Sequence, residues 1–311
     1  MRASIDIGTN TVLLLVAKVS DGELKVVNEQ QRVPRLGEGV DKERNLSEKA
    51  IRRVIDALIY FRKVLKENYP SVKTIKVTAT SAVRDANNRN EFIKQVKQEA
   101  GFEVSVLNGY EEAQFTFWGS QSVLTVEKPI AVIDIGGGST EIAVGSPAEG
   151  LTDRHSFNMG CVRFTERYLF ANPPNRNQIE DCRTEIKNVL INRPFSFAEG
   201  TKLVGVAGTV TSLVYMELGL RSYNAEALNE YQLEVATLRK WIAYIQQQNS
   251  SELIDEYPEV MKGRADIFLA GLLILEQTME LYNFDRLLVS TGGIRHGAIL
   301  KSMENKKGRP E

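Results

Sequence analysis

Two kinds of hydrophobic pattern alternate along the chain. Short apolar runs predict buried strands, and apolar residues spaced three and four apart predict helices with one buried face. Ile51, Val54 and Ile55 mark such a face, in a helix that Ser47 precedes as an N-cap and Pro70 ends. Because strands and helices follow one another in this way, we expect an α/β fold.

These hydrophobic patterns predict both strands and helices along the chain. Strands are expected at residues 3–7, 11–18, 23–29, 74–79, 102–107, 130–135, 140–144, 203–206 and 286–290. Helices are expected from residue 47 to 70 and at 91–100, 110–122, 161–170, 178–192, 210–218, 234–248, 265–281 and 295–303. Asp21-Gly22 is a predicted turn, and residues 82–89 are a predicted loop.

The pattern contains an internal repeat. Asp6-Ile7-Gly8-Thr9-Asn10-Thr11 is echoed by Asp134-Ile135-Gly136-Gly137-Gly138-Ser139-Thr140, which begins 128 residues later (134 minus 6). Each copy ends a buried strand and starts an antiparallel partner. We therefore predict two similar domains, at 1–124 and 125–311, with a helix at about 296–311 packing back on the first, and an active-site cleft between the domains with a hairpin on each side.

Both hairpins have the composition of a phosphate-binding turn. Glycine lets the backbone approach an anion closely, and successive N–H groups in a tight turn form an anion-binding nest. The hydroxyl groups of Thr9, Thr11 and Ser139 add donors. A carboxylate at the strand end, Asp6 or Asp134, is suited to holding Mg²⁺, which then bridges to phosphate oxygens.

Composition and charge narrow the functional classes. Lys and Arg total 39 and Asp and Glu total 40, a net charge of −1, which argues against a globally basic nucleic-acid binder. Two cysteines are too few for a disulfide framework, and two histidines are too few for a multi-histidine zinc site. The longest apolar run, 267–275, is far shorter than a membrane span. We expect a soluble, cytoplasmic protein that binds neither nucleic acid nor membrane, with any metal held by oxygen ligands.

Several motifs, in order along nearly the whole chain, resemble those of the exopolyphosphatase / guanosine pentaphosphate phosphohydrolase (Ppx/GppA) family of the actin-like ATPase superfamily. They are Asp6–Thr11, Arg35-Leu36-Gly37-Glu38-Gly39, Thr80-Ser81-Ala82-Val83-Arg84-Asp85-Ala86, Gly109-Tyr110-Glu111-Glu112-Ala113, Asp134–Glu141, Met159-Gly160-Cys161-Val162-Arg163, Gly208-Thr209 and Gly292-Gly293.

The resemblance implies a fold and an activity. The fold is a pair of actin-like (ribonuclease H-like) domains with the active site between them. The activity is Mg²⁺-dependent release of terminal phosphate from linear polyphosphate, or from the 5′ end of guanosine pentaphosphate. A monovalent cation such as K⁺ and a homodimer are left open.

The resemblance also assigns roles to residues. The catalytic glutamate of the family matches Glu112, the second of the Glu-Glu pair, and its metal ligands match Asp134 and Glu141. A guanidinium is suited to bidentate phosphate contact, and the family match supports that role for Arg84. The remaining predicted phosphate contacts lie in the two hairpins and at the end of a third strand: Thr9, Asn10, Thr11, Gly136, Gly137, Gly138, Ser139, Gly208 and Thr209.

Two other functions stay open at this stage. A kinase or ATPase of the same superfamily needs an adenine pocket near Gly292-Gly293, and a non-enzymatic alarmone or polyphosphate sensor needs no general base. The retained Glu112 favours hydrolysis over sensing. The role of Asp6, as a water-mediated metal contact or a structural turn residue, also stays open.

Overall fold

The computed structural model describes residues 1–20 and 23–307, in two compact units. The first unit is Met1–Ser122 with Gly292–Glu311, and the second is Val123–Thr291. The predicted Asp21-Gly22 turn and residues 308–311 of the predicted tail lie outside the described residues. The domain limits of 1–124 and 125–311 stay a prediction.

The first unit is built on a five-stranded sheet in the order β3-β2-β1-β4-β5. The strands are β1 (Arg2–Ile7), β2 (Val12–Ser20), β3 (Glu23–Arg32), β4 (Thr74–Ala79) and β5 (Val104–Val106). The pairs β1–β2 and β2–β3 are antiparallel, whereas β4 runs parallel to both β1 and β5. The carboxyl ends of β1, β4 and β5 therefore lie along one edge of the sheet, where α/β folds place ligands.

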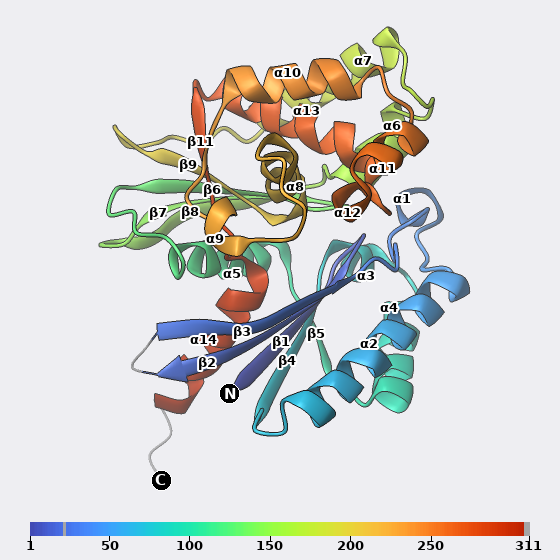
Figure 1. Ribbon diagram of the computed structural model, residues 1–311, viewed down its shortest axis with the longest axis vertical. Coiled ribbons are helices and arrows are strands. Elements are labelled where there is room, and N and C mark those ends of the chain that lie inside the picture. The colour runs from blue at the N-terminus through green and yellow to red at the C-terminus, as the bar shows by residue number, and fades with distance from the viewer. Residues whose placement is uncertain (21–22, 308–311) are drawn as a thin grey trace. The chain divides into compact units, whose positions relative to one another are not determined.

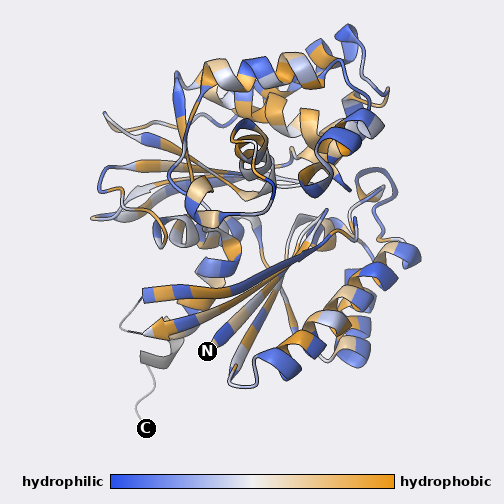
Figure 2. Cartoon of the chain, in the orientation of Figure 1, coloured by the Kyte–Doolittle hydropathy of each residue, from blue (hydrophilic) through white to orange (hydrophobic). Residues whose placement is uncertain are grey.

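Helices cover both faces of this sheet (Figure 1). The helices are α1 (Val40–Glu43), α2 (Glu48–Asn68), α3 (Ser81–Asp85), α4 (Arg89–Gln95) with a π-helical turn (Val96–Ala100), α5 (Gly109–Gln121) and α14 (Ile294–Lys307). Apolar residues of α2 pack with Leu14 and Val16 on one face, and Ile299 of α14 packs with Leu15 and Ala17 on the other. Figure 2 shows hydrophobic and hydrophilic segments following one another along α2, which fits a helix whose apolar residues lie on one buried side.

The second unit has a six-stranded sheet in the order β10-β11-β9-β6-β7-β8. Its strands are β6 (Ile130–Ile135), β7 (Thr140–Ser146), β8 (Gly150–Phe157), β9 (Lys202–Val206), β10 (Gln232–Glu234) and β11 (Arg286–Val289). Its helices are α6 (Cys161–Tyr168), α7 (Arg176–Ile191), α8 (Ala207–Glu217), α9 (Ala225–Leu228), α10 (Val235–Ile245), α11 (Ser250–Glu256), α12 (Pro258–Met261) and α13 (Ala265–Leu281). The buried α13 is the centre of the apolar core of this unit.

The two sheets share one topology. In each, three antiparallel strands are followed by two strands parallel to the first, so that β1, β2, β3, β4 and β5 correspond to β6, β7, β8, β9 and β11. Even the register shift in β2, between Val16 and Ala17, recurs in β7 between Val144 and Gly145. The structure therefore extends the repeat seen in the two hairpins to a whole sheet.

Some predicted elements differ from the structure. Residues 82–89 were expected to form a loop, but Ser81–Asp85 is the short helix α3. The strand β8 was not predicted, because its sequence lacks a clear alternation of apolar and polar residues. No helix in the described part of the chain is long and apolar enough to cross a membrane.

Candidate active site

The duplicated hairpins have the same length and the same closing bond. In the first, Ile7 pairs with Val12, and the amide of Gly8 donates to the Thr11 carbonyl oxygen at 2.9 Å. In the second, Ile135 pairs with Thr140, and the amide of Gly136 donates to the Ser139 carbonyl oxygen at 2.9 Å. Each hairpin thus has four residues between the last paired positions of its strands, beyond a buried strand end.

The N-terminus of α6 holds the second hairpin. The amide of Cys161 donates to the Gly136 carbonyl at 2.9 Å, and the amide of Val162 donates to the Gly137 carbonyl at 2.8 Å. The buried Arg163 donates from Nε to the Gly138 carbonyl at 2.7 Å. The carbonyl groups of all three glycines are therefore bonded to α6, while the amides of Gly137 and Gly138 donate no hydrogen bond among the described residues. Such amides suit an anion.

Asp134 and Glu141 face each other across this hairpin. They are directly paired on the antiparallel strands β6 and β7, so their side chains share one face of the sheet. Both are buried, with 7% and 1% of the residue exposed. Ser156 of β8 donates from Oγ to Glu141 Oε1 at 2.6 Å and orients that carboxylate.

This pair fits a magnesium ion. Within the described residues, no group of three or more His, Cys, Asp and Glu side chains is placed to bind a metal. Mg²⁺ does not require such a cage, because it keeps several waters and binds through one or two carboxylates together with substrate phosphates. Two buried carboxylates beside a Gly-rich turn are the donor set that this chemistry uses.

The first hairpin is supported differently. The amide of Gly37 donates to the Thr9 carbonyl at 2.8 Å, and the amide of Arg35 donates to the Asn10 carbonyl at 3.0 Å. The hydroxyl groups of Thr9 and Ser81 lie 3.0 Å apart. This hairpin therefore rests on the 34–39 loop and on the start of α3.

Asp6 has no second carboxylate across the sheet. Its partner on β2 is Leu13, the position that corresponds to Glu141 in the second hairpin. The Thr78 hydroxyl donates to Asp6 Oδ1 at 3.1 Å. These contacts favour a structural role for Asp6 at the strand end.

The two glutamates of the Glu-Glu pair have different surroundings. Glu111 is exposed and closes a capping box, in which its carboxylate accepts from the Asn108 amide at 2.9 Å. Glu112 is buried, with 4% exposed, and Oε2 accepts from Arg84 Nη1 at 2.8 Å. Arg84 Nη1 also donates to the Leu107 carbonyl at 3.1 Å. The structure thus brings Arg84 and Glu112 together and fixes the orientation of the Glu112 side chain.

Gly208 and Thr209 lie in the first turn of α8, directly after β9. Because β9 is parallel to β6, its carboxyl end lies beside that of the strand that carries Asp134. Ala207, which begins the turn, has a φ of 62°, a conformation rarely adopted by residues other than glycine. Arg264 donates from Nη1 to the Gly208 carbonyl and to Ser212 Oγ, both at 2.5 Å.

Three residues near these groups were missed or undervalued in the sequence. Ser156 lies on the unpredicted strand β8, although the repeat of the first sheet would have located that strand. No role was assigned from the sequence to Arg163, which is buried and bonds the second hairpin. None was assigned to Arg264 either, and burial lowers the pKa of its guanidinium.

The two cysteines provide no alternative nucleophile. Both are free and buried. Burial raises the pKa of Cys161 to about 11 and that of Cys182 to about 12. Both thiols are therefore protonated at neutral pH, and a protonated thiol is a poor nucleophile.

Known proteins resemble this chain over nearly its whole length. The model of the Ppx/GppA phosphatase family matches residues 15–306. A bifunctional 3-dehydroquinate synthase/phosphatase of Fusobacterium nucleatum is 33% identical over 98% of this chain, which spans only 47% of that relative. Exopolyphosphatase 2 of Mycobacterium tuberculosis is 32% identical over 96% of this chain and 97% of its own length.

A solved structure confirms the predicted fold. The PPX-GPPA enzyme of Aquifex aeolicus is 30% identical, with a TM-score of 0.80 over 96% of this chain and 98% of that one. The expected pair of actin-like α/β domains is therefore correct.

Proposed function

The chain belongs to the Ppx/GppA phosphatase family, and we propose that within it the protein is an exopolyphosphatase that releases the terminal phosphate of linear inorganic polyphosphate to water. The observation that carries this proposal is the buried Glu112, held by Arg84 in the first turn of α5. A fixed carboxylate is what hydrolysis needs and what binding alone does not need. The name of the full-length M. tuberculosis relative supports the choice of polyphosphate.

Glu112 acts as the general base. It orients the attacking water and accepts its proton as the water oxygen bonds to the terminal phosphorus. The phosphoanhydride bond then breaks, and its electron pair goes to the oxygen of the shortened chain. Arg84 holds the Glu112 carboxylate in place and supplies positive charge to the phosphate.

Asp134 and Glu141 would hold the Mg²⁺. When bound, this ion would neutralise charge on the phosphate oxygens and on the leaving group. Ser156 keeps the Glu141 carboxylate in one orientation. The cleft between the domains stays a prediction, and the need for a monovalent cation such as K⁺ stays open.

The hairpins bind phosphate through their amides and hydroxyl groups. In the second hairpin the donors are the amides of Gly137 and Gly138 and the hydroxyl group of Ser139. The amide of Gly136, which was also predicted to contact phosphate, donates to the Ser139 carbonyl instead. In the first, Thr9, Asn10 and Thr11 have this role, and at the start of α8 the donors are Gly208 and Thr209.

Guanosine pentaphosphate is the second candidate substrate, because a relative from Aliivibrio fischeri that is 29% identical over 96% of this chain is named guanosine-5'-triphosphate,3'-diphosphate pyrophosphatase. Its 5′ end presents the same terminal phosphoanhydride, so the proposed chemistry is unchanged. The cytoplasmic location remains a prediction. Whether the protein forms a homodimer stays open, and light scattering during gel filtration measures its oligomeric state.

The test is phosphate release from polyphosphate of defined lengths, from guanosine pentaphosphate and from ATP, each assayed separately with Mg²⁺. The polyphosphate assay contains no nucleotide. Release from polyphosphate supports the proposal. Turnover of ATP alone, dependent on a small-molecule acceptor, indicates a kinase. Binding of polyphosphate or alarmone without release indicates a sensor. In the same assay, a Glu112→Gln variant is compared with Glu111→Gln as its matched control.

A further inference from the structure

The loop that supports the first hairpin contains a strained residue. Arg35 has a φ of 52°, in the left-handed region that residues other than glycine seldom occupy. Its amide donates to the Asn10 carbonyl, and two residues later the Gly37 amide donates to the Thr9 carbonyl. A side chain at Gly37 would overlap the Thr9 methyl group, so the loop lies directly against the hairpin. The position of Thr9 and Asn10 therefore depends on the conformation of this loop.

Arg53 of α2 bonds the carbonyl groups on both sides of the strained residue. Its Nε donates to the Pro34 carbonyl at 2.6 Å, and its Nη2 donates to the Arg35 carbonyl at 3.4 Å. The same Nη2 lies 3.6 Å from Glu38. One guanidinium thus contacts three points of the loop, which a single-point donor such as lysine does not reproduce.

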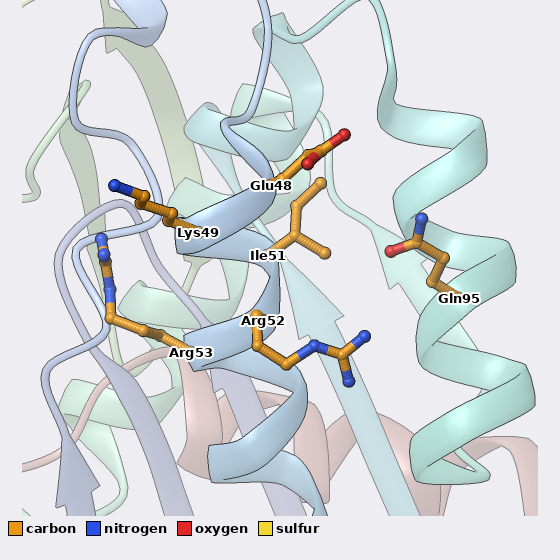
Figure 3. Close-up of a pocket in the computed structure, with 6 residues that line it drawn as sticks. All are labelled: Glu48, Lys49, Ile51, Arg52, Arg53 and Gln95. Carbon is orange, nitrogen blue, oxygen red and sulfur yellow. The ribbon is translucent and has the colours of Figure 1, made fainter.

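Arg52, the preceding residue of α2, offers a contrast. Both arginines line a surface groove of about 530 Å³ between α2 and α4, and Figure 3 shows that their side chains leave the helix in different directions. Arg52 pairs with Glu99 at 2.6 Å, and this pairing raises the pKa of its guanidinium. Among the described residues, it makes no hydrogen bond or ion pair with the 34–39 loop. The two adjacent arginines belong to the same helix, but Arg52 pairs with Glu99 whereas Arg53 bonds the 34–39 loop.

We propose that Arg53 is a positioning residue for phosphate binding by the first hairpin. It keeps Arg35 in the left-handed conformation, and the loop in turn holds the carbonyl groups of Thr9 and Asn10. The inference rests on the proposed function, in which this hairpin binds the terminal phosphates. In this proposal Arg53 contacts no substrate and affects phosphate binding only through the 34–39 loop.

The test compares Arg53→Met with Arg52→Met in the full-length protein. Hydrogen exchange reads the loop directly, since the amides of Arg35 and Gly37 are the ones that bond the hairpin. Losing a hydrogen bond to a charged donor should speed exchange at these amides and raise KM for polyphosphate by about tenfold, with a smaller change in kcat. Arg52→Met should change neither. Arg53→Lys, which retains the charge and one donor, should lie between.

A second variant tests the strain itself. Asparagine tolerates the left-handed conformation better than arginine does. In an Arg35→Asn background, Arg53→Met should therefore raise exchange and KM by a smaller factor than it does alone. An equal factor in both backgrounds would remove strain from the explanation and overturn that part of the proposal.

The outcomes separate this inference from the proposed function. Unchanged exchange at Arg35 and Gly37 in Arg53→Met and Arg53→Lys overturns the positioning role. Faster exchange with an unchanged KM supports the positioning role and contradicts phosphate binding by the first hairpin. Faster exchange with a raised KM supports both.

Discussion

The two hairpins share length, closing bond and sheet position, but they differ at one cross-strand site. Opposite Asp134 stands Glu141, whereas opposite Asp6 stands Leu13. The supports differ as well, because the N-terminus of α6 holds the second hairpin and the 34–39 loop with α3 holds the first. The same strand–turn–strand frame therefore carries different side chains in the two units. In the proposed mechanism, the second hairpin holds the metal, and the first lies in the unit that supplies the base Glu112.

The largest expected effect is a fall in kcat when the proposed base in the first unit is replaced. Glu112→Gln keeps the shape of the side chain but removes its ability to accept a proton. Because a positioned general base contributes about 10²–10⁴-fold, kcat should fall by that factor while polyphosphate still binds. Steady-state kinetics and calorimetric binding measure the two effects. An unchanged kcat in folded protein would exclude Glu112 from the mechanism.

Glu111→Gln is the control for that experiment. Glu111 closes the capping box of α5 and does not contact Arg84. Its replacement should change stability by no more than about 1 kcal/mol and leave kcat close to that of the wild type. Equal losses of kcat in both variants would point to damage of the helix rather than loss of the base.

The next largest effect is expected on Mg²⁺ dependence, which should differ between variants of the two hairpins. Asp134→Asn and Glu141→Gln should each raise the Mg²⁺ concentration for half-maximal activity by at least about tenfold, since each removes an anionic ligand. Asp6→Asn should leave that concentration unchanged, whatever it does to kcat. Mg²⁺ titrations of activity provide the measurement. A shift in Asp6→Asn as large as the other two would mean that both hairpins hold the metal.

A methyl group added to the segment that supports each hairpin should destabilise the protein by different amounts. A Cβ at Gly160 would lie 2.5 Å from the Gly137 carbonyl oxygen, which is backbone, whereas a Cβ at Gly37 would meet the side chain of Thr9. We expect Gly160→Ala to destabilise by about 1–3 kcal/mol and Gly37→Ala by less. Thr9→Ser, which removes the methyl group, should restore Gly37→Ala but has no counterpart for Gly160→Ala. Denaturant unfolding of the single and double variants measures these changes in the free energy of unfolding. If Thr9→Ser does not restore the stability of Gly37→Ala, the added methyl group does not clash with Thr9.

A further difference between the units is expected in their stability at acid pH. Burial lowers the pKa of His296, in the first unit, from 6.5 to about 3. The unfolded chain therefore binds the extra proton first, and stability falls as the pH decreases from about 6.5 to about 3, by at most about 1.4 kcal/mol per pH unit. His155 of the second unit is partly exposed and should contribute less.

Hydrogen exchange between pH 7 and pH 4 compares the units, after correction for the intrinsic exchange rate. The first unit should lose protection before the second, and His296→Gln should reduce the difference. Loss of protection in the second unit first would contradict this assignment.

The sequence predicted the duplicated hairpins because their geometry depends on local residues. A strand end, a short Gly-containing turn and a return strand are all encoded within a few positions, and two copies strengthen each other. The α3 helix was missed because five residues are too few to show a helical period. The bond between Arg84 and Glu112 joins residues 28 positions apart, and no local pattern specifies such a contact.

The same reasoning explains the supports that were missed. Arg163 and Arg53 look like surface charges in a sequence, because only the fold shows which carbonyl groups lie within their reach. By contrast, the choice of Glu112 over Glu111 had a usable local signal. Asn108 and Glu111 have the spacing of a capping box, which assigns Glu111 to the helix end and leaves Glu112 for the site.

In the proposed mechanism, water attacks the terminal phosphorus of polyphosphate with Glu112 as the base. Hydrolysis in ¹⁸O-labelled water with Mg²⁺ and no nucleotide, followed by mass spectrometry of the released phosphate, tests this step. We expect one ¹⁸O atom in each phosphate released, and almost no labelled phosphate from Glu112→Gln over the same time. Unlabelled phosphate with the label in the shortened chain, or labelled phosphate at the wild-type rate from Glu112→Gln, would contradict it.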